Sequence, residues 1–222
     1  MRKHMKIIPG PNRKARSGQS FVEMALLFPV LLVMISGMVE FGFMLNQFLA
    51  IVDAARNAAR FSSDGDFNNR DGNTNCDPGA GTVTSDFYFQ TACLALSELR
   101  QERPTITVNL GRGDDILVSA FSISGWGSPS VNGRYPVAGG WSYAQAATGT
   151  RNQSSNISTA DVISRLQVGA PNTGLVIVEI FYHYDQILGL PWVTAFVPNP
   201  VLLHAYTFMP LVSAEPTSTP SP

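Results

Sequence analysis

The hydrophobic pattern of the N-terminal quarter predicts one long helix. Residues 24–39 are sixteen consecutive residues without a charge, and the apolar character continues to Leu45 with Glu40 as the one interruption. Counted from Phe21, this segment has 25 residues. At about 1.5 Å per residue it would measure roughly 37 Å as a helix, and this length is enough to cross a hydrocarbon core of about 30 Å.

Beyond this segment the pattern becomes amphipathic and keeps the helical period. Apolar residues recur at one helical spacing, whereas Asp53, Arg56 and Arg60 fall on another face. The apolar set is Phe48, Ile51, Val52, Ala55, Ala58 and Ala59. We therefore expect a single helix over residues 19–61, apolar all round in its first half and amphipathic in its second.

After residue 62 the pattern predicts an α+β domain. Residues 62–79 are rich in turn formers, and residues 84–103 have helical periodicity with Pro104 as the stop. Glu98, Arg100, Gln101 and Glu102 are expected at the solvated end of this helix. Strands are expected at 105–110 and 115–124, joined as a hairpin by the turn at 111–114, and again at 175–187 and 202–212. The 175–187 strand has Val and Ile on both faces, so we expect it to be buried.

Residues 125–174 are rich in Gly, Ser, Asn and Thr and give weaker signals. A short helix is expected at 158–166, with Asp161 at the third position of a capping-box-like start. The aromatic residues scattered through this region would serve packing or surface adhesion. Residues 213–222 form a Pro/Ser/Thr tail that cannot pack into a core.

Charge is distributed very unevenly between the two ends of the chain. Residues 1–18 hold six basic residues and no acid; since the formal net charge is −1, the remainder carries −7. Basic residues before an apolar span favour a cytoplasmic leader, so the 62–212 domain is expected outside the membrane.

The chain has no nucleotide-binding, hydrolase or zinc-protease motif and no basic face for nucleic acid. We therefore expect no enzyme, no cofactor, no metal and no nucleic-acid partner.

Three interpretations of the apolar segment compete. It is a signal anchor with Glu23 and Glu40 near the two interfaces, or a secretory signal peptide cut near residues 49–50 or 53–54. The third is a prepilin: Gly18 ends the basic leader, and a lone Glu23 follows five residues later in an otherwise apolar helix start. An apolar core of about 7–15 residues is typical of secretory signals, and this segment is longer.

Three stretches resemble the TadE-like family, pilin-like proteins of tight-adherence (Tad, or Flp-type) pilus systems. They are RSGQSFVEMALLFPVLL at 16–32, GMVEFG at 37–42 and DAARNAAR at 53–60, with a looser similarity at 176–184 and 203–210. The resemblance implies a pilin-like architecture and cleavage by a prepilin peptidase between Gly18 and Gln19. It also implies that Glu23 meets the new α-amino group of Gln19 on a neighbouring subunit.

Two further sites are expected within this frame. Gly37 inside the helix suggests a close helix–helix contact, because a helical glycine costs about 1 kcal/mol that tight packing can offset. Cys76 and Cys93 are expected to form a disulfide outside the reducing cytoplasm.

Asp64, Asp66 and Asn68 have the spacing of a calcium loop, but the glycine and the final acid of that motif are missing, which favours a plain loop. His183 and His204 are expected to be neighbours on adjacent strands, each satisfied without a metal.

Together these observations predict an α+β, pilin-like chain in four parts: a leader (1–18), a transmembrane and amphipathic helix (19–61), an extracytoplasmic domain (62–212) and a disordered tail (213–222). It would cross the bacterial cytoplasmic membrane once with its N-terminus inside, as a subunit or assembly factor of a Tad-type pilus that extends to the cell surface. Its partners would be the prepilin peptidase, other pilin-like subunits and the membrane. The alternatives are a single-pass envelope protein whose exported domain binds another partner, and a secreted enzyme.

Overall fold

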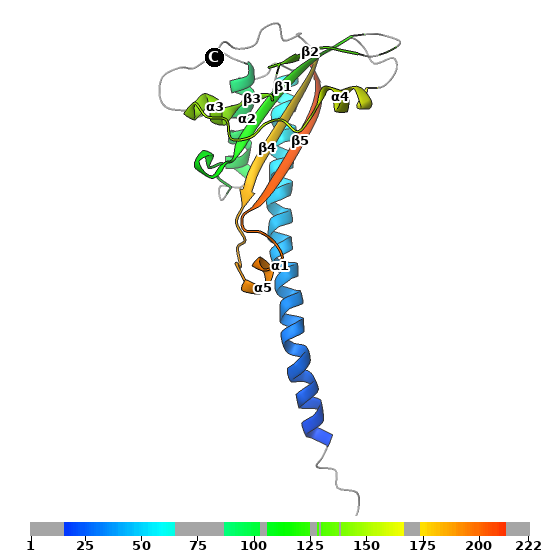
Figure 1. Cartoon of the computed structure of the whole chain (residues 1–222), viewed down its shortest axis with the longest axis vertical. Coiled ribbons are helices and arrows are strands. Elements are labelled where there is room, and N and C mark those ends of the chain that lie inside the picture. Colours follow the sequence, from blue (N-terminus) through cyan, green and yellow to red (C-terminus); the bar gives the residue numbers. More distant parts are fainter. Residues whose placement is uncertain are drawn as a thin grey trace, which may run out of the picture.

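A single helix dominates the structure. This computed structural model describes residues 16–64, 87–102, 106–124, 128, 130–137, 139–166 and 174–211. Helix α1 (Arg16–Ser63) has 48 residues and continues without a break through Pro29. At about 1.5 Å per residue it is roughly 72 Å long. Its N-terminal half projects from a small α+β head that packs against the other half (Figure 1). The prediction of one long helix is confirmed.

The head is built on one antiparallel sheet in the order β2-β1-β4-β5, with the short β3 paired to β1 beside β2. The strands are β1 (Asp115–Ser124), β2 (Ser130–Tyr135), β3 (Trp141–Ser142), β4 (Gly174–Tyr184) and β5 (Val201–Leu211). Central strand β4 is buried on both faces, as its unbroken Val/Ile pattern predicted. The α+β class with an antiparallel sheet is confirmed.

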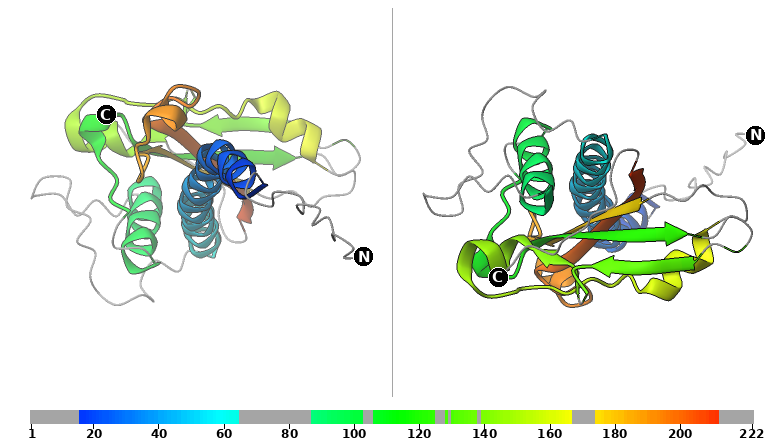
Figure 2. Two further views of the ribbon diagram at one scale, coloured as in Figure 1. Left: turned by 90° about the horizontal axis from the view of Figure 1, so that it is seen from below. Right: turned by 90° about the horizontal axis from the view of Figure 1, so that it is seen from above.

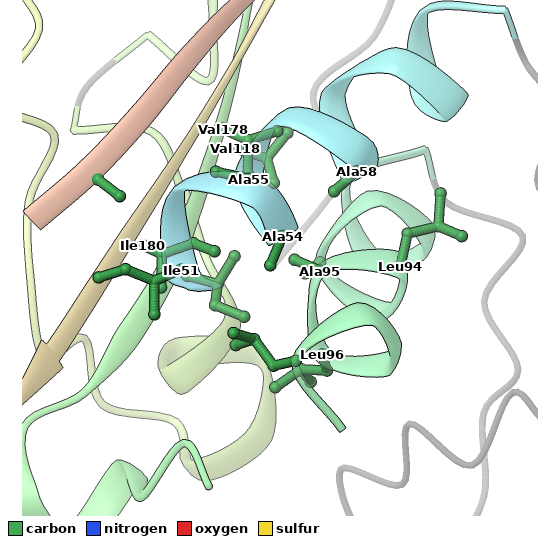
Figure 3. Close-up of a cluster of buried hydrophobic side chains, with 14 of the residues drawn as sticks. Ile51, Ala54, Ala55, Ala58, Leu94, Ala95, Leu96, Val118, Val178 and Ile180 are labelled. Carbon is green, nitrogen blue, oxygen red and sulfur yellow. The ribbon is translucent and has the colours of Figure 1, made fainter. Parts of the chain in front are cut away.

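Two helices cover one face of the sheet (Figure 2). The second half of α1 lies against β4 and β5, and α2 (Phe87–Glu102) lies beside α1. Buried side chains of α1 fill the space between the sheet and α2 (Figure 3). The α1 residues are Ile51, Ala54 and Ala58. They face Val118, Val178 and Ile180 of the sheet on one side and Leu94, Ala95 and Leu96 of α2 on the other. The alanines at positions 54, 55, 58 and 59 of α1 are fully buried, and their small side chains let the helix backbone come close to both layers.

The second helix was predicted correctly, but one of its residues was misplaced. Glu98 was grouped with the solvated end of the helix, and this is wrong: its side chain is buried and accepts a hydrogen bond from Asn57 Nδ2 at 3.0 Å. The pair joins α2 to α1. Because the partner lies 41 residues away, helical periodicity alone assigned Glu98 to the wrong surface.

The predicted hairpin between 105–110 and 115–124 is wrong. Residues 106–109 are not a strand, and Leu110–Arg112 form a 3-10 turn. Side chains satisfy the backbone here: Asn109 accepts from the Gly111 N–H at 3.0 Å, and Asp114 accepts from the Asn109 N–H at 2.8 Å. Meanwhile β1 pairs with β4 along one edge and with β2 and β3 along the other.

The region between β1 and β4 contains short elements at the rim of the sheet. Besides β2 and β3 it holds α3 (Tyr143–Thr148) and α4 (Thr159–Arg165). At α4, Ser158 and Asp161 form a reciprocal capping box, which confirms the predicted helix start. Tyr135, Trp141 and Tyr143 pack on or in the core, which supports the packing role for these aromatic residues.

Several predictions lie outside the described residues. They concern residues 1–15 of the leader, most of the 62–79 loop with its calcium pattern, Cys76, and the 213–222 tail.

Candidate membrane and assembly surface

The N-terminal half of α1 exposes apolar side chains on all its sides. Every residue from 20 to 35 is exposed, and the helix bears no charge between Glu23 and Glu40. The large apolar side chains here are Phe21, Val22, Met24, Leu26, Leu27, Phe28, Val30, Leu31, Leu32, Val33, Met34 and Ile35. A helix that is apolar all round is stable in lipid or among other helices rather than in water. Among the described residues, α1 is the one helix long and apolar enough to span a membrane.

Four of the predicted site residues lie on this half of α1: Gly18, Gln19, Glu23 and Gly37. The backbones of Gly18 and Gln19 belong to its first turns, and Glu23 is exposed five residues after Gly18, about 7.5 Å further along the axis. The structure therefore places these residues on one continuous helix. The processing of Gly18 and the pairing of Glu23 stay predictions.

Gly37 makes no close helix contact within the chain. A Cβ added to Gly37 would meet no other heavy atom within 4 Å. The predicted contact would therefore have to involve another chain, and it stays a prediction.

Glu40 holds a position that the sequence did not reveal. The sequence placed it at the outer membrane interface, whereas in the structure its side chain is also buried, with 5% of the residue exposed. Its carboxylate accepts hydrogen bonds from Tyr184 Oη at 2.5 Å and from the backbone N–H groups of Ile187 and Leu188 at 2.9 and 2.8 Å. Three donors on one carboxylate offset the cost of burying its charge.

These bonds fasten the connection between β4 and β5 to α1. We name residues 185–200, which include the short helix α5 (Pro191–Thr194), the β4–β5 arm. Nearer the N-terminus of α1, Trp192 Nε1 donates to Ser36 Oγ at 3.0 Å. At the base of the arm, the Gln186 N–H donates to Asn199 Oδ1 at 3.1 Å, which closes it into a loop. In Figure 1 the arm lies beside α1, beyond the end of the sheet.

Electrostatic effects at the base of the arm keep the Tyr184 hydroxyl protonated, so that it can donate its hydrogen bond to Glu40. Burial, and then the hydrogen bond to Glu40, raises the pKa of the Tyr184 hydroxyl. Tyr184 thus remains a neutral donor to the carboxylate at physiological pH. Next to it, a bidentate ion pair joins Arg112 to Asp185 and lowers the pKa of that carboxyl.

His183 and His204 each have a carboxylate partner. His183 Nδ1 lies 2.8 Å from Asp114 Oδ1, and His204 Nε2 lies 3.1 Å from Glu179 Oε1. His204 pairs in register with Phe181 of β4 rather than with His183. In the described part of the chain, no group of three His, Cys, Asp or Glu side chains could hold a metal ion.

Cys93 lies on α2 and is 7% exposed. Its proposed partner, Cys76, is outside the described residues, so the disulfide between them stays a prediction.

Comparison with known proteins finds a family match at the N-terminal helix. Residues 18–60 match the family model described as TadE-like protein, which covers about a fifth of the chain and coincides with α1. No curated protein and no solved structure matches the chain. The resemblance to this family is confirmed over α1 and indicates a protein associated with the Tad pilus. With one candidate membrane helix in the described part of the chain, the family match suggests a membrane-anchored, single-pass protein.

Proposed function

We propose that this chain is a pilin-like subunit or assembly factor of a Tad-type pilus, cut by a prepilin peptidase between Gly18 and Gln19. The observation that best supports this function is the exposed apolar half of α1, which carries Glu23 near its start and projects from a head packed on the other half. Such a helix can lie in the membrane before assembly and among the helices of neighbouring subunits afterwards.

Glu23 is the residue on which assembly would depend. An acid at the centre of a membrane helix costs about 2.5–3.5 kcal/mol on insertion scales, and less near an end. Cleavage after Gly18 would create an α-amino group on Gln19. Pairing between Glu23 and this amine on a neighbouring subunit would offset the cost of the charge and fix the axial offset between subunits.

The orientation follows from the charge of the leader. Its six basic residues favour the cytoplasmic side, so the peptidase would cut at the inner face of the bacterial cytoplasmic membrane. The head would lie outside, either at the membrane or in a surface pilus. Nothing in this role requires catalysis by the chain itself.

The experiment compares Glu23→Gln with the matched control Glu23→Asp, which keeps the charge. Both variants are expected to be processed and to stay in the membrane, because a neutral residue enters lipid more easily than a carboxylate. Glu23→Gln should be lost from sheared surface and multimeric fractions, since breaking a buried ion pair costs about 3–5 kcal/mol per subunit added. Glu23→Asp should retain part of the assembly. Normal assembly of Glu23→Gln would argue instead for a simple envelope anchor whose head binds another partner.

A further inference from the structure

We propose that the β4–β5 arm is a second membrane contact, which lies in the outer interfacial layer of the bilayer beside α1 and inserts Trp192 and Phe196 among the lipids. The inference rests on α1 crossing a membrane and does not require that the chain assemble into a pilus.

The composition of the arm suits lipid rather than water. From residue 186 to residue 203 the chain has no Asp, Glu, Lys or Arg. Five large apolar side chains of the arm are exposed: Ile187, Leu188, Trp192, Phe196 and Val197. Phe196 is 89% exposed, although a phenylalanine that meets only water gains nothing from that position. So many exposed apolar side chains within one short loop mark an interaction surface.

The hydrogen bonds to α1 fix the level of the arm. Ile187 and Leu188 bond to Glu40, whereas Trp192 bonds to Ser36, four residues closer to the N-terminus of α1. Four residues of helix correspond to about 6 Å. The arm therefore runs along α1 towards its apolar half, which bears exposed apolar side chains at the same level, among them Met34, Ile35 and Met38.

The expected position of the membrane boundary coincides with this level. A hydrocarbon core of about 30 Å takes up about 20 helical residues, so a span that starts at Phe21 ends near Glu40. Trp192 would then sit just inside the outer boundary. Tryptophan is enriched at that depth because its ring is apolar while its N–H needs a polar partner. Here Ser36 is that partner.

A bilayer also explains the arrangement better than a second copy of the chain does. The exposed side chains of the arm continue the exposed apolar surface of α1 at the same depth, and α1 would lie in the membrane before any assembly. Glu40 lies at the base of the arm with its carboxylate satisfied, so no bare charge separates the two apolar surfaces.

The first test uses Trp192 as its own probe. Replacing Trp126→Phe and Trp141→Phe in the full chain leaves Trp192 as the one remaining tryptophan. This variant is reconstituted into phosphatidylcholine vesicles with or without bromine on the acyl chains near the headgroup. We expect the brominated lipid to remove about half of the Trp192 emission or more. A control variant with Trp126→Phe and Trp192→Phe keeps Trp141, which packs against Phe89 in the head, and its emission should not change.

The second test asks what covers Phe196. A photo-crosslinking phenylalanine analogue at position 196 should capture lipid in these vesicles. The matched control is position 137, which is 81% exposed but lies beyond β2, at the edge of the sheet opposite β5, and should capture no lipid. Unquenched Trp192 emission, or crosslinks from position 196 to a second chain in place of lipid, would overturn the proposal. Either failure would leave the assembly test on Glu23 unaffected.

Discussion

Replacing Glu40 with alanine should release the β4–β5 arm from α1 while the head stays folded. The carboxylate is the acceptor for Tyr184 Oη and for the N–H groups of Ile187 and Leu188. Alanine removes the acceptor from all three donors at once. Tyr184 is 1% exposed, so its hydroxyl cannot turn to water without local opening. Of these four residues, Tyr184 alone belongs to the hydrophobic core between the helices and the sheet, so the rest of that core should be unaffected.

The size of the effect follows from the number of donors left without an acceptor. An unsatisfied buried donor costs about 1–3 kcal/mol, and bonds to a charged acceptor are at the upper end. The two backbone donors can recover part of this loss from water once the arm opens. We therefore expect a local destabilisation of about 3 kcal/mol, which corresponds to roughly a hundredfold increase in the open population because each 1.4 kcal/mol is a factor of ten.

Hydrogen exchange of the full chain in lipid nanodiscs measures this directly. In Glu40→Ala, amides of residues 185–200 should exchange about a hundredfold faster than in the parent, while amides of α2 keep their protection. Glu40→Gln keeps an acceptor oxygen and should lie in between. Asp53→Ala, which removes an exposed acid from the same helix, is the control and should not change the arm. Unchanged protection of the arm in Glu40→Ala would refute the conclusion that Glu40 holds the arm against α1.

Three further predictions follow from the same structure. The raised pKa of Tyr184 exceeds its usual unfolded value of about 10, so the stabilisation it gives is complete below about pH 10 and is lost as the pH rises through the raised value. An alkaline absorbance titration of Tyr184→Phe should therefore lack a component that ionises late, and an unchanged high-pH limb would contradict this. Intact masses of the exported protein should increase by two hydrogens on reduction if Cys76 and Cys93 are joined; two thiols that react with alkylating reagent without reduction would exclude the bridge. Gly37→Leu should fold and be processed, because open space surrounds that position within the chain, but it should lose crosslinked multimers. Multimers at the parental level would mean that Gly37 faces lipid alone.

Hydrophobic patterns within single helices and strands made much of the fold predictable. Unbroken apolarity followed by a helical period determined α1, and apolar residues on both faces determined the central strand β4. The Ser158–Asp161 capping box was predictable because both of its hydrogen bonds are local in sequence. In each case the signal lies within one element.

What the sequence did not reveal depends on distant partners. Alternation at 105–110 predicted a strand, but an extended segment becomes a strand only when a neighbouring edge is free, and both edges of β1 are occupied. Glu98 and Glu40 were assigned to solvated or interfacial positions because the donors that bond to them come from residues 41 to 148 positions away. Two features hinted at the arm: Glu40 within an otherwise apolar stretch of helix, and the lack of Asp, Glu, Lys and Arg from residue 186 to residue 214.

The most direct test of the proposed function is the N-terminal sequence of the chain from membrane and sheared-surface fractions. We predict a mature chain that begins at Gln19 in both fractions, and an uncut precursor confined to the membrane when Gly18 is replaced by leucine. A mature chain that begins at Ala50 or Ala54 would contradict the proposal and identify the apolar segment as a cleaved secretory signal, and an uncut chain that begins at Met1 would identify it as a simple anchor.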